Sequence, residues 1–197
     1  MLNIAVLISG GGTNLQAIID ECENKNINGR VKVVISNKVD AYGLQRAKKH
    51  NIKGVYETDE SKIIEILKEN KIDLIVLAGY LKIISPKLVN EYKNKIINIH
   101  PSLIPAFCGK GYYGEKVHQS VIDYGVKVSG ATVHFVDENA DTGPIIMQKA
   151  VNVNQDDDAK KLAVRVLKVE HEILTKSISL FCENKLTVDG RRVYINE

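Results

Sequence analysis

The fold is decided by the stretch LNIAVLISGGGTNLQAIIDECEN, which occupies residues 2–24. Its first part, Leu2–Ile8, is a short apolar run, which is typical of a strand buried on both faces. Its last part, Asn14–Asn24, has apolar residues three and four positions apart with polar residues between them, which predicts a helix. The three glycines between these parts therefore join a strand to a helix.

The same alternation continues outward from this stretch. Further short apolar runs, interpreted as strands, are Val31–Ile35, Leu74–Leu77 and Lys95–Ile99. Amphipathic stretches, interpreted as helices, are Ala41–Lys49, Ser61–Asn70 and Pro86–Tyr92. Alternating strands and helices with short connections build parallel sheets, whose ligands bind beyond the carboxyl ends of the strands. We therefore expect an α/β fold with an open, doubly wound, mostly parallel sheet of Rossmann-like form.

The second half of the chain has a different pattern. Val126–Val136 and Pro144–Val153 are extended segments joined by the acidic turn Asp137–Gly143, which predicts a hairpin-like extension. The segment Asp156–Phe181 begins with three acidic residues, which favour a helix N-terminus, and continues with a stripe of apolar residues. It predicts a long helix that closes the domain.

Length and composition predict one domain over residues 1–197, because 44% hydrophobic content is enough for a substantial core. The net charge is +3 and the lysines are scattered, so nucleic acid is not an expected partner. No apolar run approaches the roughly 20 residues of a membrane span, and no leader peptide precedes the first strand. We expect neither membrane association nor processing.

The cysteines are Cys22, Cys108 and Cys182, which are far apart and odd in number. None forms a Cys-x-x-Cys pair, so neither a disulfide framework nor a zinc site is indicated. This usage favours a reducing, cytoplasmic location.

The glycine-rich segment Ser9–Asn14 has free backbone amides at a helix start, which together with the helix dipole favour a phosphate. A plain structural turn is an equally open interpretation. A dinucleotide fingerprint would need glycine at Leu15, and the second strand is followed by Ser36-Asn37-Lys38 without an acidic ribose partner. A nicotinamide oxidoreductase is therefore the weakest alternative.

The segment NIHPSLIP, residues 98–105, places Asn98 and His100 two residues apart at the end of an apolar strand. Alternate residues of a strand share one face, so both side chains can address the same small volume. An amide donor beside a titratable ring suits a reaction in which an oxyanion forms and a proton moves, as in acyl transfer. A hydrogen-bonded strand end is the alternative interpretation.

Asp141 lies in the segment DTGP, about forty residues beyond His100. A carboxylate near His100 would raise the pKa of the imidazole and orient its ring, although a plain turn also explains the segment. We expect a structural role for His134 on the preceding strand. The segment Cys108–Gly114 is expected to be a mobile loop whose tyrosines serve either packing or stacking.

Four segments resemble, in the same order, those of the phosphoribosylglycinamide formyltransferases within the formyltransferase superfamily. They are Ser9–Leu15, Leu77–Ser85, Ile97–Pro105 and Thr132–Pro144. The resemblance implies that the protein is a formyltransferase, which transfers a formyl group from 10-formyltetrahydrofolate to the amine of glycinamide ribonucleotide in purine biosynthesis. It implies no metal.

The resemblance also implies roles for individual residues. Asn98, His100 and Asp141 would form the catalytic centre, in which Asn98 and protonated His100 stabilise the oxyanion while Asp141 holds His100 charged. The implied ribonucleotide-binding residues are Gly12, Thr13, Asn14 and Glu170. The implied folate-binding residues are Leu81, Lys82, Ile83, Ile84, Asn98 and Lys62. The family commonly has Arg at the position of Lys82, so a bidentate contact there is replaced by a single ammonium group.

Other functions share parts of this pattern. Another folate-dependent formyltransferase or a 10-formyltetrahydrofolate hydrolase would use the same three catalytic residues, but each would be expected to carry an additional domain. A nucleotide-binding module would use the glycine segment without turnover. We expect a monomer or homodimer that acts on the two small-molecule substrates.

Overall fold

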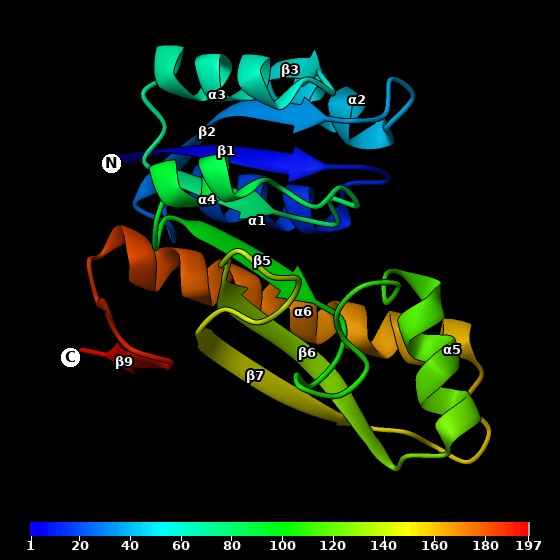
Figure 1. The fold of residues 1–197 in the computed structure, drawn as a ribbon. Coiled ribbons are helices and arrows are strands. Elements are labelled where there is room, and N and C mark those ends of the chain that lie inside the picture. Colours follow the sequence, from blue (N-terminus) through cyan, green and yellow to red (C-terminus); the bar gives the residue numbers. More distant parts are fainter. Residues whose placement is uncertain (197) are drawn as a thin grey trace.

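The chain alternates strands and helices up to residue 100 and then changes pattern, as the sequence predicts (Figure 1). The computed structural model describes residues 1–196. Its elements are β1 Leu2–Ile8, α1 Thr13–Glu23, β2 Gly29–Ser36, α2 Tyr42–Lys49, β3 Lys53–Tyr56, α3 Glu60–Glu69, β4 Leu74–Leu77, α4 Pro86–Glu91, β5 Ile96–His100, α5 Glu115–Tyr124, β6 Val128–Phe135, β7 Ile145–Asn152, α6 Ala159–Cys182, β8 Leu186–Asp189 and β9 Arg192–Ile195.

The strands form one open sheet in the order β3-β2-β1-β4-β5-β6-β7-β9-β8. The strands from β3 to β5 pair in parallel, whereas β6 is antiparallel to both β5 and β7. The predicted hairpin-like extension is therefore confirmed as β6 and β7. The chain winds outward from β1 to β3 and then crosses back to β4, so the winding direction reverses beside β1. Ligand sites of such sheets lie beyond the carboxyl ends of the strands at this reversal.

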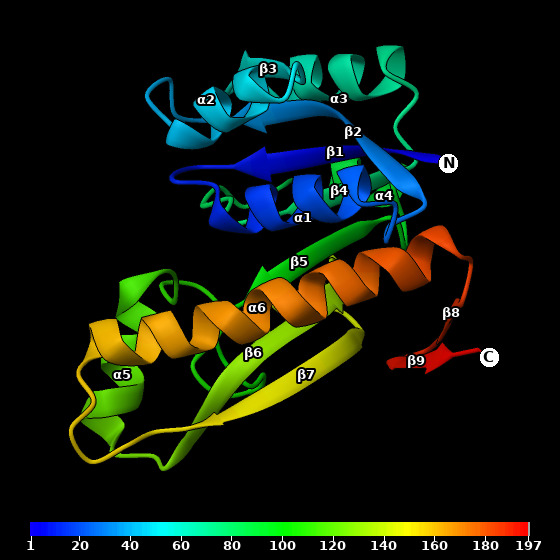
Figure 2. The same cartoon turned by 180° about the vertical axis from the view of Figure 1, so that it is seen from behind.

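Successive residues of the central strands point to opposite faces of the sheet, and the side chains on both faces are apolar. Helices therefore cover both faces. On one face Ile4, Val6 and Ile8 of β1 belong to a core shared with α1 and α6, the helices in front in Figure 2. On the other face Ala5 and Leu7 belong to a core shared with α3 and α4. The long closing helix α6 is confirmed, and it lies along α1 and β6.

Short polar side chains start the later helices. Asp59 accepts a hydrogen bond from the amide of Ser61 at the start of α3, and Asp158 accepts one from Lys161 at the start of α6. Ser85 caps α4, whose first residue is Pro86. Such caps satisfy amides that have no partner inside the helix. The predicted start of α6 at Asp156 is therefore three residues early, because Asp158 is the cap.

The sequence patterns missed four elements. Strand β3 has Val55 as its only half-buried apolar side chain. The short strands β8 and β9 at the other end of the sheet have no buried side chain, so none of the three shows an apolar run. Helix α5 follows the predicted loop and buries only Val117, His118 and Val121, a short stripe that includes a polar residue. Within residues 1–196, none of the helices combines the length and apolar character needed to cross a membrane.

Candidate active site

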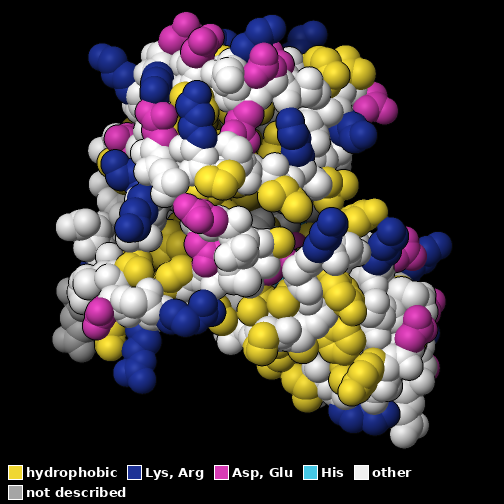
Figure 3. Space-filling view, viewed as in Figure 1, with side chains coloured by type: hydrophobic (Ala, Val, Ile, Leu, Met, Phe, Trp, Pro, Cys, Tyr) yellow, Lys and Arg dark blue, Asp and Glu magenta, His cyan; other side chains and the backbone are white. Residues whose placement is uncertain are grey.

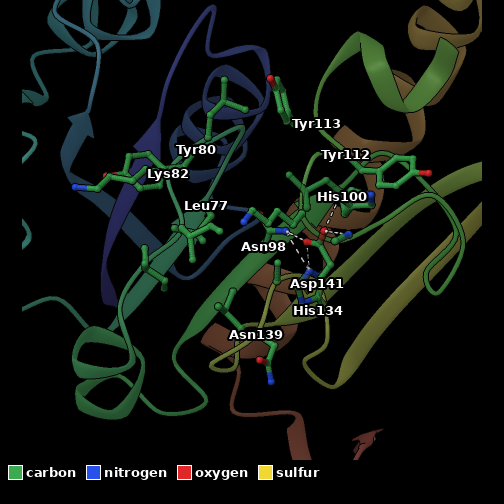
Figure 4. A pocket seen from close by; sticks show the side chains of 18 of the residues that line it. Leu77, Tyr80, Lys82, Asn98, His100, Tyr112, Tyr113, His134, Asn139 and Asp141 are labelled. Carbon is green, nitrogen blue, oxygen red and sulfur yellow. Dashed lines mark hydrogen bonds and ion pairs between the residues drawn. The ribbon is translucent and has the colours of Figure 1, made fainter. Parts of the chain in front are cut away.

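A cavity of about 270 Å³ opens beyond the carboxyl ends of β4 and β5 (Figure 4). Its walls come from segments that are far apart in the sequence: residues 79–84 after β4, 98–101 at the end of β5, 109–114 before α5, His134 on β6, and 136–141 after β6. Hydrophobic side chains gather around the loop between β5 and α5 on the face shown in Figure 3. The cavity therefore combines an apolar rim with the polar residues at the strand ends.

The three predicted catalytic residues meet in this cavity. His100 Nδ1 lies 3.5 Å from Asp141 Oδ2, and Asn98 Nδ2 lies 3.5 Å from Asp141 Oδ1. The carboxylate also accepts a 2.8 Å hydrogen bond from the amide of Gly109. Asp141 has a φ of 58°, in the left-handed region that Asp tolerates better than most residues. The turn between β6 and β7 thus brings the carboxylate against the end of β5.

His134 is a fourth member of this cluster, and its buried, hydrogen-bonded ring agrees with the structural role that the sequence favoured. It stands directly opposite Asn98 in the β5–β6 register. His134 Nδ1 lies 2.7 Å from the carbonyl oxygen of Phe135, which can only accept, so Nδ1 carries the proton. Nε2 is then placed to accept from Asn98 Nδ2 at 3.1 Å, and it also lies 3.6 Å from Asp141 Oδ1. His134 therefore fixes which way the Asn98 amide points. Pairing between distant strands is the signal that the sequence lacked.

The orientation of His100 is also fixed by a carbonyl. His100 Nε2 lies 2.9 Å from the carbonyl oxygen of Phe107 and must donate to it. That carbonyl is held in place because the loop after β5 is tied down by Thr132, whose hydroxyl donates to Ser102 and accepts from the amide of Ile104. The proton that His100 can gain or lose is therefore the one on Nδ1, which faces Asp141.

Burial and the neighbouring charge act in opposite directions on the pKa of His100. Burial lowers the pKa of His100, and this outweighs Asp141 and the Phe107 carbonyl, which act to raise it. Asp141 acts on the pKa of His100 in the expected direction, but burial has the larger effect and favours the neutral ring. Burial acts to raise the pKa of Asp141, but contacts with His134, His100 and the Gly109 amide hold it below its ordinary value. The directions of both shifts therefore favour a neutral imidazole beside a charged carboxylate.

The predicted ribonucleotide residues lie at the carboxyl end of β1 rather than in the cavity wall. Gly12 precedes α1 with a φ of 69°, and Thr13 is exposed at the first position of the helix. Asn14 Nδ2 donates a 2.8 Å hydrogen bond to Glu170 on α6, and both side chains are buried. Burial raises the pKa of Glu170, and Asn14 only partly opposes this. The structure thus brings Asn14 and Glu170 together across 156 positions of sequence.

Most of the predicted folate residues line the cavity. Leu81, Lys82, Ile83 and Ile84 form its wall after β4, and Leu81 and Ile83 are 54% and 64% exposed, so their apolar surface is free for a ligand. Lys82 Nζ donates to the carbonyl oxygen of Thr58. Lys62 lies on α3, outside the residues that line the cavity.

One side chain joins the two parts of the site. The hydroxyl of Ser9, at the end of β1, accepts a 2.9 Å hydrogen bond from the amide of Leu81 in the cavity wall and donates to Asn37 after β2. The glycine segment and the cavity are therefore held in one frame.

The loop before α5 also contributes to the cavity. Tyr112 and Tyr113 lie on its wall, and three glycines of this loop have positive φ angles, namely Gly109, Gly111 and Gly114. Glycine adopts such angles without strain, so the loop can turn both aromatic side chains along the opening. Within residues 1–196, no group of three His, Cys, Asp or Glu side chains is placed to hold a metal ion.

Comparisons with known proteins agree with this architecture. The formyl transferase family matches residues 2–178. Phosphoribosylglycinamide formyltransferase of Haemophilus influenzae is 40% identical over the whole chain, which covers 94% of that protein. A chloroplastic relative of the same name from Vigna unguiculata is 41% identical over 93% of the chain, and the chain spans 62% of that relative's length.

A solved structure gives the same result in three dimensions. The crystal structure of glycinamide ribonucleotide transformylase 1 from Symbiobacterium toebii superposes with a TM-score of 0.94 at 43% identity, covering 100% of this chain and 95% of that one. The chain therefore belongs to the formyl transferase family, among relatives that carry the name phosphoribosylglycinamide formyltransferase.

Proposed function

We propose that this protein transfers the formyl group of 10-formyltetrahydrofolate to the amine of 5′-phosphoribosylglycinamide. The products are N-formylglycinamide ribonucleotide and tetrahydrofolate, in a step of purine biosynthesis. The amine nitrogen forms a bond to the formyl carbon, the bond from that carbon to the folate nitrogen breaks, and one amine proton passes to the folate nitrogen. Residues 1–197 are proposed to act as one formyltransferase domain.

The observation that carries this proposal is the convergence of Asn98, His100 and Asp141 at the floor of one cavity. Asn98 Nδ2 has two hydrogens, and His134 Nε2 accepts one of them. The second has only the long contact to Asp141, so it can donate instead to the oxygen that becomes negative during attack. An amide donor held in this way stabilises the transition state more than the ground state.

His100 is proposed to carry the proton. Because its ring is neutral at rest, Nδ1 can accept a proton from the attacking amine through water and return it to the leaving nitrogen. Asp141 is 3.5 Å from Nδ1 and stabilises the charged ring while it holds the proton. The positive ring also stabilises the neighbouring oxyanion. Protonated His100 is thus a state reached during the reaction rather than the resting state.

The two substrates are assigned to the two parts of the site. Gly12, Thr13 and Asn14 bind the ribonucleotide phosphate, and Glu170 contacts the glycinamide group. Leu81 and Ile83, with their exposed apolar surface, and the buried Ile84 of the same wall suit the flat ring of a folate, and Lys82 and Lys62 are assigned to its acidic tail. Ser9 connects the two parts, which fixes the distance between amine and formyl carbon.

The experiment that tests this proposal follows tetrahydrofolate release by absorbance, with and without glycinamide ribonucleotide. We expect release only when the ribonucleotide is present. Release without it would indicate a hydrolase, and no release from folded protein would contradict the assignment of a formyl donor.

We propose a cytoplasmic location from the state of the cysteines. Cys22, Cys108 and Cys182 are all free, which fits a reducing cytoplasm. Size-exclusion chromatography with light scattering tests the expected monomer or homodimer.

A further inference from the structure

Arg46 of α2 contacts the glycine segment and the helix that follows it. Its Nε donates a 2.8 Å hydrogen bond to the carbonyl oxygen of Gly11, and its Nη1 donates a 3.1 Å hydrogen bond to Gln16 Oε1 on α1. The guanidinium lies over the ring of Tyr42, 5.1 Å from the ring centre, in a cation–π contact. One planar group therefore joins the glycine loop, α1 and α2.

The start of α2 presses against the same loop. The amide of Gly43 donates a 3.0 Å hydrogen bond to the carbonyl oxygen of Gly10. A Cβ atom added to Gly43 would lie 2.2 Å from Ile8 Cδ1, and one added to Gly12 would lie 2.8 Å from Gly43 Cα. The close approach requires glycine at position 12, where the clash is with backbone, whereas a side chain at position 43 would displace the buried end of Ile8. Two successive carbonyls of the loop, those of Gly10 and Gly11, are thus bound by α2.

These contacts decide where the loop's amides point. In a trans peptide the C=O and N–H bonds point in opposite directions. Because the Gly10 and Gly11 carbonyls point toward α2, the amides of Gly11 and Gly12 in the same peptide units point away from it. Among residues 1–196 neither amide donates a hydrogen bond. Two unpaired donors are therefore presented on the side of the loop opposite Arg46.

We propose that Arg46 is a positioning residue for the ribonucleotide phosphate. It orients the peptide unit between Gly11 and Gly12, and it does so through geometry rather than through its charge alone. The inference rests on the proposed function, which places the phosphate at this loop. A lysine at position 46 would keep the charge, but a single ammonium group on a flexible stem does not reproduce a planar fork bonded to two fixed acceptors.

The test compares Arg46→Ala and Arg46→Lys with Lys48→Ala, a control that removes an exposed positive charge from the same helix. We expect both Arg46 variants to raise KM for the ribonucleotide about ten- to hundredfold, as for a lost hydrogen bond from a charged group. Their kcat and their KM for the folate should stay within about twofold of wild type, and the control should match wild type. Unchanged ribonucleotide KM in Arg46→Ala, or full recovery in Arg46→Lys, would overturn the positioning role.

A second readout is independent of turnover. Inorganic phosphate is titrated into the 15N-labelled protein while the amide resonances of Gly11 and Gly12 are followed. We expect saturable shifts in wild type and in Lys48→Ala that weaken in both Arg46 variants. If wild type transferred no formyl group but this pattern held, the proposed function would fail and the positioning role would stand. Equal phosphate affinity in all four proteins would overturn the role itself.

Discussion

At the scale of single residues, the protonation states in the site follow from carbonyl oxygens. The carbonyls of Phe107 and Phe135 can only accept, so each assigns a proton to one nitrogen of a histidine. His134 is thereby an acceptor for Asn98, and His100 keeps Nδ1 free toward Asp141. The chemistry of the cluster is therefore set by backbone atoms that the sequence motif does not reveal.

Replacing Asn98 tests its proposed role as the oxyanion donor. Asn98→Ala should lower kcat by a few hundredfold, because loss of one such donor costs roughly 3 to 4 kcal/mol in the transition state. Asn90→Ala, which removes an exposed amide on α4, is the control. Both proteins should melt close to the wild-type temperature. Near-normal turnover by folded Asn98→Ala would exclude the assigned role.

The pH dependence tests the pairing of His100 with Asp141. Activity that needs neutral His100 is lost as the pH falls through its pKa, which burial places below the ordinary value. Asp141 acts to raise that pKa, so Asp141→Asn should lower it further and move the acidic limb of kcat/KM to lower pH. Turnover should also fall by about a hundredfold or more because the charged ring loses its partner. A limb at the wild-type position would make Asp141 a structural residue.

At the scale of elements, the site depends on where α1 and α6 meet. Asn14 in the first turn of α1 donates to Glu170 near the middle of α6, and Glu170 is only 9% exposed. A buried carboxyl group favours its protonated form, so this contact costs stability whenever the group is charged. The buried carboxyl group of Glu170 thus lowers the stability of the fold when it is charged, which fits a residue whose proposed role is to bind the substrate amine.

Glu170→Gln tests this cost. The native pKa of Glu170 is raised above its unfolded value, so the wild type loses stability as the pH rises through the unfolded value toward the native one. The variant keeps an acceptor for Asn14 without the charge, so its melting temperature should exceed that of wild type at pH 8 but not at pH 4. Each kcal/mol corresponds to about 2–4 °C for a chain of this size. A variant less stable at pH 8 would contradict the burial argument.

The first position of α1 gives a test of the proposed phosphate site. Thr13→Glu places a negative charge at an exposed helix start, where it favours the helix dipole but repels a phosphate. KM for the ribonucleotide should rise at least about tenfold, whereas KM for the folate should change little. Thr13→Gln, of similar size and without charge, is the matched control. An equal rise in both constants would place the phosphate elsewhere.

At the scale of the whole molecule, the sequence predicted what depends on local patterns. Apolar runs identified β1 and β4 with their bounds, and helical periodicity identified α6. The sequence patterns missed β3, because it is an exposed edge strand, and α5, because it is a short helix whose buried side chains include a histidine. The Asn98 and His100 pair could be found from a single strand.

The remaining parts of the site depend on long-range pairing. His134 lies beside Asn98 because β6 pairs antiparallel with β5. Arg46 contacts the glycine segment because α2 packs against the loop after β1. Each of these contacts joins residues about thirty or more positions apart. Residue patterns near either partner carry no sign of them.

The two parts of this site are proposed to bring one amine to one formyl carbon. The most direct test uses 10-formyltetrahydrofolate carrying a radiolabelled formyl group and follows the label after incubation with glycinamide ribonucleotide. We predict that one label appears in the ribonucleotide product for each tetrahydrofolate released, and that Asn98→Ala slows both together. Label recovered as formate, with none in the ribonucleotide, would contradict the claim.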